Sequence, residues 1–498
     1  MTKKELERLA EVEKVIRGMA EEEGLKTTDI IFEVVPAQRV IEGMAYNFPR
    51  NFSHWSFGRD YERIKTIYSH TFSGIPYEQV WNLEPPRALL CETNPLALQI
   101  LVLAHVYGHV DFFLANDYCK RGRANANIAE QARNAAERFR EYEARYGSKE
   151  VEDVIDAGMS IMWHQDPDVF YDEPEDDELV RKQLIELEQA RFKAKQAQAG
   201  YKMDPKEKEF WEAKIRGLEN KTPPRPTHDL LHYVIRNSPK PLKPWMQDVL
   251  SVVRSQARTL TPNGRTKMLN EGWATYWHIN FMRRLFNMGL ITPEERDQMR
   301  RFHVGVIAEL KRKFNWYRVG LALFENILER WDKGQFGKEY DDCEDSRQRS
   351  DWDTKAGLGK EKIFEVRAHS NDRAAVENLF SDEFIREQKI YVYREMPTSD
   401  SIDDVIVENR PNVVRAVLRR MLMSMSPPQI TVENGNYENQ QLLHLKHHDT
   451  GFELDPTYRD LTLLKVFHLW GRKVLLETKV DDKDVTVTYD GHKHRIVH

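Results

Sequence analysis

The sequence has few cysteines. Only Cys91, Cys119 and Cys343 occur among 498 residues, at wide spacing and without a CxxC pair. An odd number of cysteines so spaced argues against a disulfide framework and is typical of a protein in a reducing compartment.

Other signatures are missing as well. Neither GxGxxG after a strand nor GxxxxGK[ST] occurs, so the sequence does not support ATP binding. The net charge of −6 provides no global basic field, and we expect no nucleic-acid partner and no membrane partner. The opening stretch "MTKKELERLAEVEKVIRGMAEEEG" predicts a charged amphipathic helix without the apolar core of a signal peptide. We therefore expect a cytoplasmic protein.

The pattern of apolar residues predicts a mainly α fold with two domains. Helical spacing dominates residues 1–384, which we expect to form a large helical core. Within it, the charge runs and closing Pro cluster of residues 171–226 predict a solvated helical excursion. The stretch at residues 48–86 is rich in aromatics, Gly and Pro, and it predicts irregular segments laid over the core. Residues 385–498 alternate as strands do, and they predict a small α+β domain with the order β, α, β, β, α, β, β.

Two histidines lie four residues apart in an apolar run, "LVLAHVYGHVDFF", at residues 101–113. On a helix His105 and His109 share one face, where two imidazoles can chelate one metal ion. The alternative is a pair of core histidines that are hydrogen-bonded to backbone or carboxylate groups.

A second stretch, "MLNEGWATYWH" at residues 268–278, places Glu271 and His278 on one helical face. A glutamate in an otherwise apolar helix is costly unless it is paired or coordinated. The stretch resembles the N-E-G-x-A helix of thermolysin-type zinc aminopeptidases, whose glutamate is the third ligand beside two HxxxH histidines. This resemblance implies a zincin-like two-helix site in which His105, His109 and Glu271 bind a divalent metal such as zinc. His278 is then a fourth ligand, a group that orients a ligand, or a proton donor.

The sequence departs from those peptidases at Val106, which stands where they have a general-base glutamate. If the protein hydrolyses a substrate, its base must come from elsewhere. The candidate catalytic residues are His278, Asp111 and Asp166, and Glu130 is a further carboxylate. The long separation of His109 from Glu271 also indicates a different or elaborated scaffold.

Six stretches resemble, in this order, the SpoVR (stage V sporulation protein R) family: "FSHWSFGRDYERIKTIY", "AHVYGHVDFFLAN", "WMQDVLSVVR", "TKMLNEGWATYWH", "NWYRVGLALF" and "VENLFSDEFIREQKIYVY". The resemblance implies a bacterial protein linked to formation of the spore cortex or to starvation and stress responses. It also implies a serine protein kinase and its co-encoded partner protein as partners.

Three hypotheses stay open. The first is a SpoVR-family protein with a metal-capable polar pocket between the two helices. The second is a non-catalytic scaffold or regulator of a kinase-linked complex, in which the histidines and Glu271 form a structural polar network. The third is a divergent metal-dependent hydrolase.

Overall fold

The structure is a computed structural model of the chain. It describes residues 1–46, 52–70, 77–123, 128–165, 176–199, 205–219, 221–309, 314–397, 402–424, 428–448 and 453–497. Among the candidate residues, Asp166 lies outside the described ranges.

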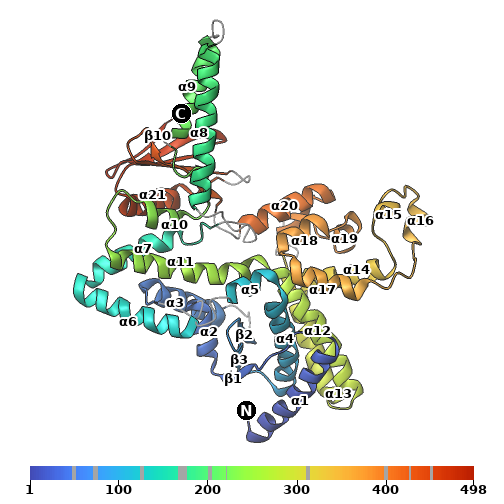
Figure 1. Ribbon diagram of the computed structural model, residues 1–498. Helices are drawn as coiled ribbons and strands as arrows, with labels where there is room; N and C mark the ends of the chain where they lie inside the picture. The colour runs from blue at the N-terminus through green and yellow to red at the C-terminus, as the bar shows by residue number, and fades with distance from the viewer. Residues whose placement is uncertain are drawn as a thin grey trace. The chain divides into compact units, whose positions relative to one another are not determined.

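The protein is mainly helical with a small C-terminal sheet, as the sequence predicts, and it divides into two units (Figure 1). Unit 1 comprises Met1–Asn134 and Thr259–Met425, and unit 2 comprises Ala135–Arg258 and Ser426–His498. The domain boundary that the sequence suggests at residue 385 stays a prediction.

The elements of unit 1 are the helices α1 (Lys3–Glu22), α2 (Ala37–Tyr46), α3 (Trp55–His70), α4 (Leu96–Ala115), α5 (Asp117–Arg123), α12 (Lys267–Asn287), α13 (Pro293–Val306), α14 (Trp316–Asp332), α15 (Lys338–Asp341), α16 (Ser346–Ser350), α17 (Gly359–His369), α18 (Asp372–Asn378), α19 (Asp382–Glu387) and α20 (Pro411–Ser424), and the strands β1 (Ile31–Val35), β2 (Glu78–Trp81), β3 (Arg87–Cys91), β4 (Val392–Pro397) and β5 (Ile402–Glu408). Two helices, α6 (Ile128–Tyr146) and α11 (Pro244–Arg265), contribute residues to both units.

The elements of unit 2 are the helices α7 (Ser148–Ile161), α8 (Asp176–Ala199), α9 (Pro205–Glu219), α10 (Leu230–Asn237) and α21 (Pro456–Trp470), and the strands β6 (Ile430–Tyr437), β7 (Leu442–His447), β8 (Val474–Val480), β9 (Lys483–Tyr489) and β10 (His494–Val497).

The centre of unit 1 is α4, which is apolar on all sides and buried along nearly its whole length. A helix of this kind belongs in the core of a large protein or in a membrane. Among the described helices, α4 alone is long and apolar enough to cross a membrane, and 94% of its apolar window is buried inside the molecule. That burial is typical of the core helix of a soluble protein.

Helix α12 approaches both α4 and α14 through residues without bulky side chains, and Figure 1 shows α4 beside α12. A Cβ added at Gly108 of α4 would lie 2.5 Å from the Ala274 Cα of α12. A Cβ added at Gly272 would lie 2.3 Å from the carbonyl carbon of Gly320 on α14. Both distances are far shorter than van der Waals contact, so the close approach of these helices requires glycine. We call these two contacts the glycine seams.

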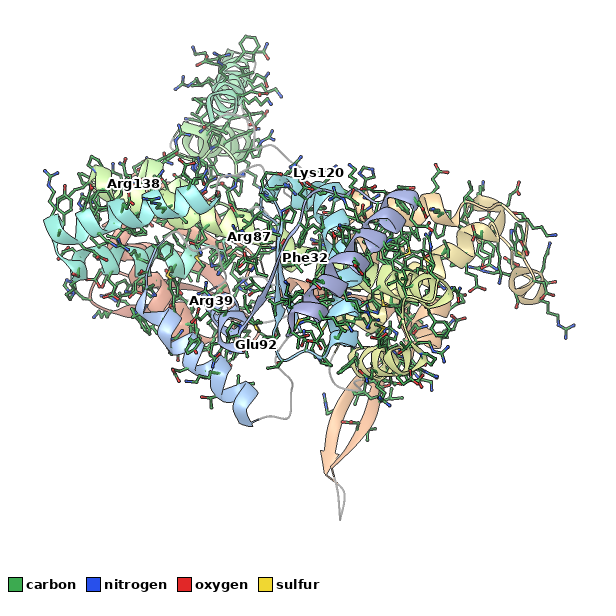
Figure 2. The ribbon with its side chains drawn as sticks, turned by 90° about the horizontal axis from the view of Figure 1, so that it is seen from below. Phe32, Arg39, Arg87, Glu92, Lys120 and Arg138 are labelled. Atoms are coloured by element: carbon green, nitrogen blue, oxygen red, sulfur yellow. The ribbon has the colours of Figure 1, made fainter. Side chains whose placement is uncertain are left out.

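A small sheet completes unit 1, in the order β1-β3-β2, with β1 parallel and β2 antiparallel to β3. Phe32 of β1 faces α1 and α4, where its ring centroid lies 6.4 Å from that of Tyr107 (Figure 2). The prediction of irregular segments at residues 48–86 was wrong for α3 and β2. Strand β3 is a short apolar run without alternation, because it pairs on both edges and is buried from its second residue onward.

Unit 2 carries the C-terminal sheet, in the order β10-β9-β8-β7-β6, where β7 and β8 are parallel and the other pairs antiparallel. Helix α21 packs on β8 and β9. The predicted order for residues 385–498 lacked two strands, β5 and β10. Strand β5 exposes three successive apolar residues, Val405, Ile406 and Val407, and β10 has only 4 residues, so neither shows a clear alternation of buried and exposed positions. The predicted helical excursion is present as the helix pair α8 and α9, which lie side by side (Figure 1).

Candidate metal centre

Glu271 of α12 faces both histidines of α4. Its Oε2 lies 3.6 Å from Nε2 of His105 and 3.5 Å from Nε2 of His109. The two histidines are only 4% and 6% exposed, and their rings are nearly perpendicular, with centroids 4.5 Å apart. The glycine seam between Gly108 and Ala274 explains the short distances, because it allows the backbones of α4 and α12 to meet at this level.

The separations fit ligands of one ion better than hydrogen bonds. Among the described residues, Nε2 of His105 and Oε2 of Glu271 are buried atoms without a hydrogen-bond partner. An unmade hydrogen bond at a buried polar atom costs about 1–3 kcal/mol. Two ligand atoms at about 2.0–2.1 Å from a tetrahedral zinc ion lie about 3.3–3.4 Å from each other. The observed 3.6 Å between the two orphaned atoms is close to that value.

A fourth group, Glu78, joins the cluster from β2. Its Oε1 lies 3.9 Å from Nε2 of His105, and ligand atoms of Glu78, His105 and His109 all lie within 4.8 Å of one another. Sequence reasoning missed Glu78, because no spacing rule connects a residue of a short edge strand to helices elsewhere in the chain. Its one signal is a carboxylate at the start of the short strand "EQVW", which packs against α4. We call Glu78, His105, His109 and Glu271 the His/Glu cluster.

Hydrogen bonds orient both imidazoles of α4. Nδ1 of His109 lies 2.9 Å from Oδ1 of Asn270, the residue before Glu271. An amide oxygen only accepts, so Nδ1 of His109 carries the proton and Nε2 presents its lone pair to the cluster. Nδ1 of His105 lies 3.0 Å from Nδ1 of His278, whose Nε2 lies 3.0 Å from Nδ1 of His303 on α13. Metal-binding histidines are commonly held in this way through the second ring nitrogen.

Aromatic rings cover the two imidazoles. Tyr317 of α14 stacks on His105, with centroids 6.1 Å apart and ring planes at 21°. Phe113 stacks on His109, with centroids 6.2 Å apart and ring planes at 16°. Together with the hydrogen bonds, these rings restrict the rotation of both histidines.

The electrostatics leave the lone pair of His109 available at neutral pH. Burial, followed by the charge of His105, lowers the pKa of His109 to about 4. Burial also acts against a charge on His105, but the carboxylates of Glu271 and Glu78 outweigh it and raise the pKa of His105. Burial opposes the charge on Glu271, yet the imidazoles of His105 and His109 lower its pKa. Burial raises the pKa of Glu78. A proton therefore competes with an ion for His105 more strongly than it does for His109.

The predicted residues have different surroundings in the structure. His278 adjoins His105 and is 4% exposed, which fits the expected role of a group that orients a ligand. Asp111 is fully buried on α4, where its carboxylate accepts hydrogen bonds from the Lys26 backbone, Trp273 Nε1 and Arg367 Nη1. These bonds join the segment that follows α1 to α4, α12 and α17, so Asp111 ties these parts of unit 1 together.

Glu130, Asp166 and Val106 are the other positions that the sequence singled out. Glu130 is an exposed residue of α6, and Asp166 lies outside the described residues. Val106, at the position of the peptidase base, is completely buried among apolar side chains of the unit 1 core. Val106 therefore contributes to the packing of the apolar core.

These features define the class of protein as a mainly helical one with a candidate His/Glu metal centre in its core. Comparison with protein-family models gives the family: the model described as "SpoVR like protein" matches residues 3–426, and "SpoVR-like C-terminal domain" matches residues 428–481. The chain therefore belongs to the SpoVR family, as the sequence resemblance implied.

A search of curated proteins finds a relative in Escherichia coli (strain K12), the "Uncharacterized protein YcgB". It is 25% identical over 499 residues, which cover 96% of this chain and 92% of that protein. No solved structure matches the chain.

Proposed function

We propose that the His/Glu cluster binds a divalent metal ion, with zinc as the first metal to test. His105, His109 and Glu271 are its ligands in a zincin-like arrangement, and a second carboxylate, that of Glu78, lies beside His105. The observation that carries the proposal is the pair of buried, unpartnered atoms among the described residues, Nε2 of His105 and Oε2 of Glu271, which face each other at 3.6 Å. Nitrogen and carboxylate oxygen are the donor atoms that zinc takes in His/Glu sites.

The test is metal analysis of the purified full chain by mass spectrometry and by zinc titration. We expect wild-type protein to bind one ion per chain tightly, and a His105→Ala, His109→Ala double variant to lose that ion. A His369→Ala variant is the matched control, because His369 is an exposed histidine of the same unit and bonds to Asp117. Uptake of metal that is equal in the double variant and the control would exclude the site.

A second candidate function is hydrolysis assisted by the metal. Glu78 favours it, because its carboxylate lies beside His105 in a protein whose Val106 cannot act as a base. A metal at the cluster would polarise a bound carbonyl or water, and the carboxylate of Glu78 would hold and accept the proton of that water. We expect a Glu78→Gln variant to keep the metal and to lose any hydrolytic activity that the zinc-loaded protein shows.

Family membership supports a cellular role. We propose that the protein acts in the cytoplasm in spore cortex formation or in a starvation or stress response, and that it binds a serine protein kinase and the partner protein co-encoded with it. In the alternative scaffold role, the His/Glu cluster is a structural polar network. A pull-down with those two proteins distinguishes the roles, since a scaffold retains both partners in the His105→Ala, His109→Ala variant, whereas a metal-dependent assembly loses them.

A further inference from the structure

Three imidazoles form a chain that begins at the His/Glu cluster. His105 of α4 contacts His278 of α12, and His278 contacts His303 of α13. Both contacts join ring nitrogens 3.0 Å apart, which is hydrogen-bond distance. His105 and His278 are buried, and His303 is half-buried, so the chain runs from the core of unit 1 toward its surface.

The direction of hydrogen donation in this chain follows from counting protons. A hydrogen bond between two ring nitrogens needs an N–H on one side and a lone pair on the other. A neutral imidazole has one of each. His278 uses both of its nitrogens, so it accepts through one and donates through the other. Donation therefore runs in one sense along the whole chain, either from His105 to His303 or from His303 to His105.

A metal ion selects one of these two senses. To bind an ion through Nε2, His105 must carry its proton on Nδ1, which then donates to Nδ1 of His278. The proton of His278 must stand on Nε2, which donates to Nδ1 of His303. We infer that His278 and His303 are positioning residues for the metal ligand His105, and that binding of the ion fixes donation in the sense His105 to His278 to His303. This inference rests on the proposed metal site.

The chain is an orienting device and does not carry protons from the site. Once an ion occupies Nε2 of His105, no proton can enter the chain from the cluster through that nitrogen. As a consequence, His303 of α13 orients His278 of α12, and His278 in turn orients the ring of His105 on α4. His109 has a separate support in Asn270, so the two histidine ligands are oriented independently.

Matched amide substitutions test the inference. An asparagine side chain places its amide close to the position of Nδ1 of a histidine, whereas a glutamine places its amide close to the position of Nε2. His278→Asn therefore keeps an acceptor for Nδ1–H of His105, and His278→Gln does not. We expect His278→Gln to weaken zinc binding about 10–100-fold, the usual loss when a partner of a metal-binding histidine is removed. We expect His278→Asn to weaken it only a few-fold.

His303 allows the same comparison nearer the surface. His303→Asn keeps an acceptor for Nε2–H of His278, and His303→Gln removes it, so the glutamine variant should bind zinc more weakly than the asparagine variant. Circular dichroism and thermal melting of each variant show whether it is folded. Equal zinc affinity in the asparagine and glutamine variants of both positions would overturn the inference.

A spectroscopic measurement on the unmodified protein covers the case in which a variant does not fold. In zinc-loaded wild-type protein labelled with nitrogen-15 histidine, we expect His278 and His303 to carry their protons on Nε2. A proton on Nδ1 of His278 in the zinc-loaded state would contradict the assignment. If the wild-type chain takes up no zinc, the proposed metal site and this inference both fail. If it takes up zinc but shows the other tautomer, only the inference fails.

Discussion

Replacement of Gly108 by alanine is the sharpest test of how the fold positions the His/Glu cluster. The added Cβ would lie 2.5 Å from Cα of Ala274 and 3.1 Å from its Cβ. Because the closest atom belongs to the backbone of α12, no side-chain rotation relieves the contact. The helices must separate by about 0.9 Å to reach an ordinary contact of 3.4 Å.

This displacement has two expected effects. Overpacking of a core typically costs about 1–3 kcal/mol of unfolding free energy. The same movement lengthens the separations of Glu271 from His105 and His109, now 3.6 and 3.5 Å, to about 4.5 Å. Ligand atoms of one tetrahedral zinc ion lie about 3.3–3.4 Å apart, so we expect zinc affinity to fall at least tenfold.

The assays are chemical denaturation and zinc titration, with Gly18→Ala as the matched control. Gly18 lies inside α1 of the same unit, and an added Cβ there meets no atom within 4 Å. Alanine at such a position stabilises a helix by about 0.5–1 kcal/mol. If Gly108→Ala behaves like Gly18→Ala in both stability and zinc affinity, the reasoning from the glycine seam is refuted.

Three further predictions concern single side chains. Asn270→Leu removes the acceptor for Nδ1–H of His109 and should weaken zinc binding about 10–100-fold. Asn270→Asp keeps an acceptor, so this variant should bind zinc at least as tightly as wild type. A calorimetric titration in which the leucine variant binds zinc more tightly than the aspartate variant would contradict this. Burial lowers the pKa of His164 to about 4 from 6.5, so its stabilising effect is complete above pH 6.5 and is lost as the pH falls through 4. The loss reaches about 3 kcal/mol, and urea denaturation of a His164→Phe variant should show a correspondingly weaker pH dependence. Finally, a thiol reagent should modify Cys343 but not Cys119 in the native protein, because Cys119 is buried and its pKa is raised to about 12. Labelling of Cys119 before unfolding would show that the core of unit 1 opens.

Helical periodicity predicted half of the site well. His105 and His109 share a face because they are one turn apart, and that inference needs only local geometry. The pairing of this face with Glu271 came from resemblance to a known helix, and the short distances in the structure agree with it. Glycine in both stretches was an unused signal, since Gly108 and Gly272 lie at the closest helix contacts.

The other half depends on tertiary structure. Glu78 and His303 reach the cluster and the imidazole chain from β2 and α13, and no repeat or spacing in the sequence connects them to α4. Asp111 shows the opposite difficulty. Its place beside the two histidines of α4 suggested a catalytic carboxylate, whereas in the structure it is buried and accepts hydrogen bonds from Trp273 and Arg367 that link helices. Sequence alone does not distinguish these cases, because both require the position of distant partners.

The glycine seams also determine what the protein would be without an ion. In a zinc finger the ion draws the chain together, so that chelation unfolds it. Here the backbone of α12 packs directly against those of α4 and α14, and Asp372 accepts hydrogen bonds from the amides of Met268 and Leu269 at the start of α12. We therefore expect the proposed ligand set to keep its arrangement when no ion is bound. A site of this kind would exchange its ion without global unfolding, and the fixed gap between α4 and α12 would select ions by size.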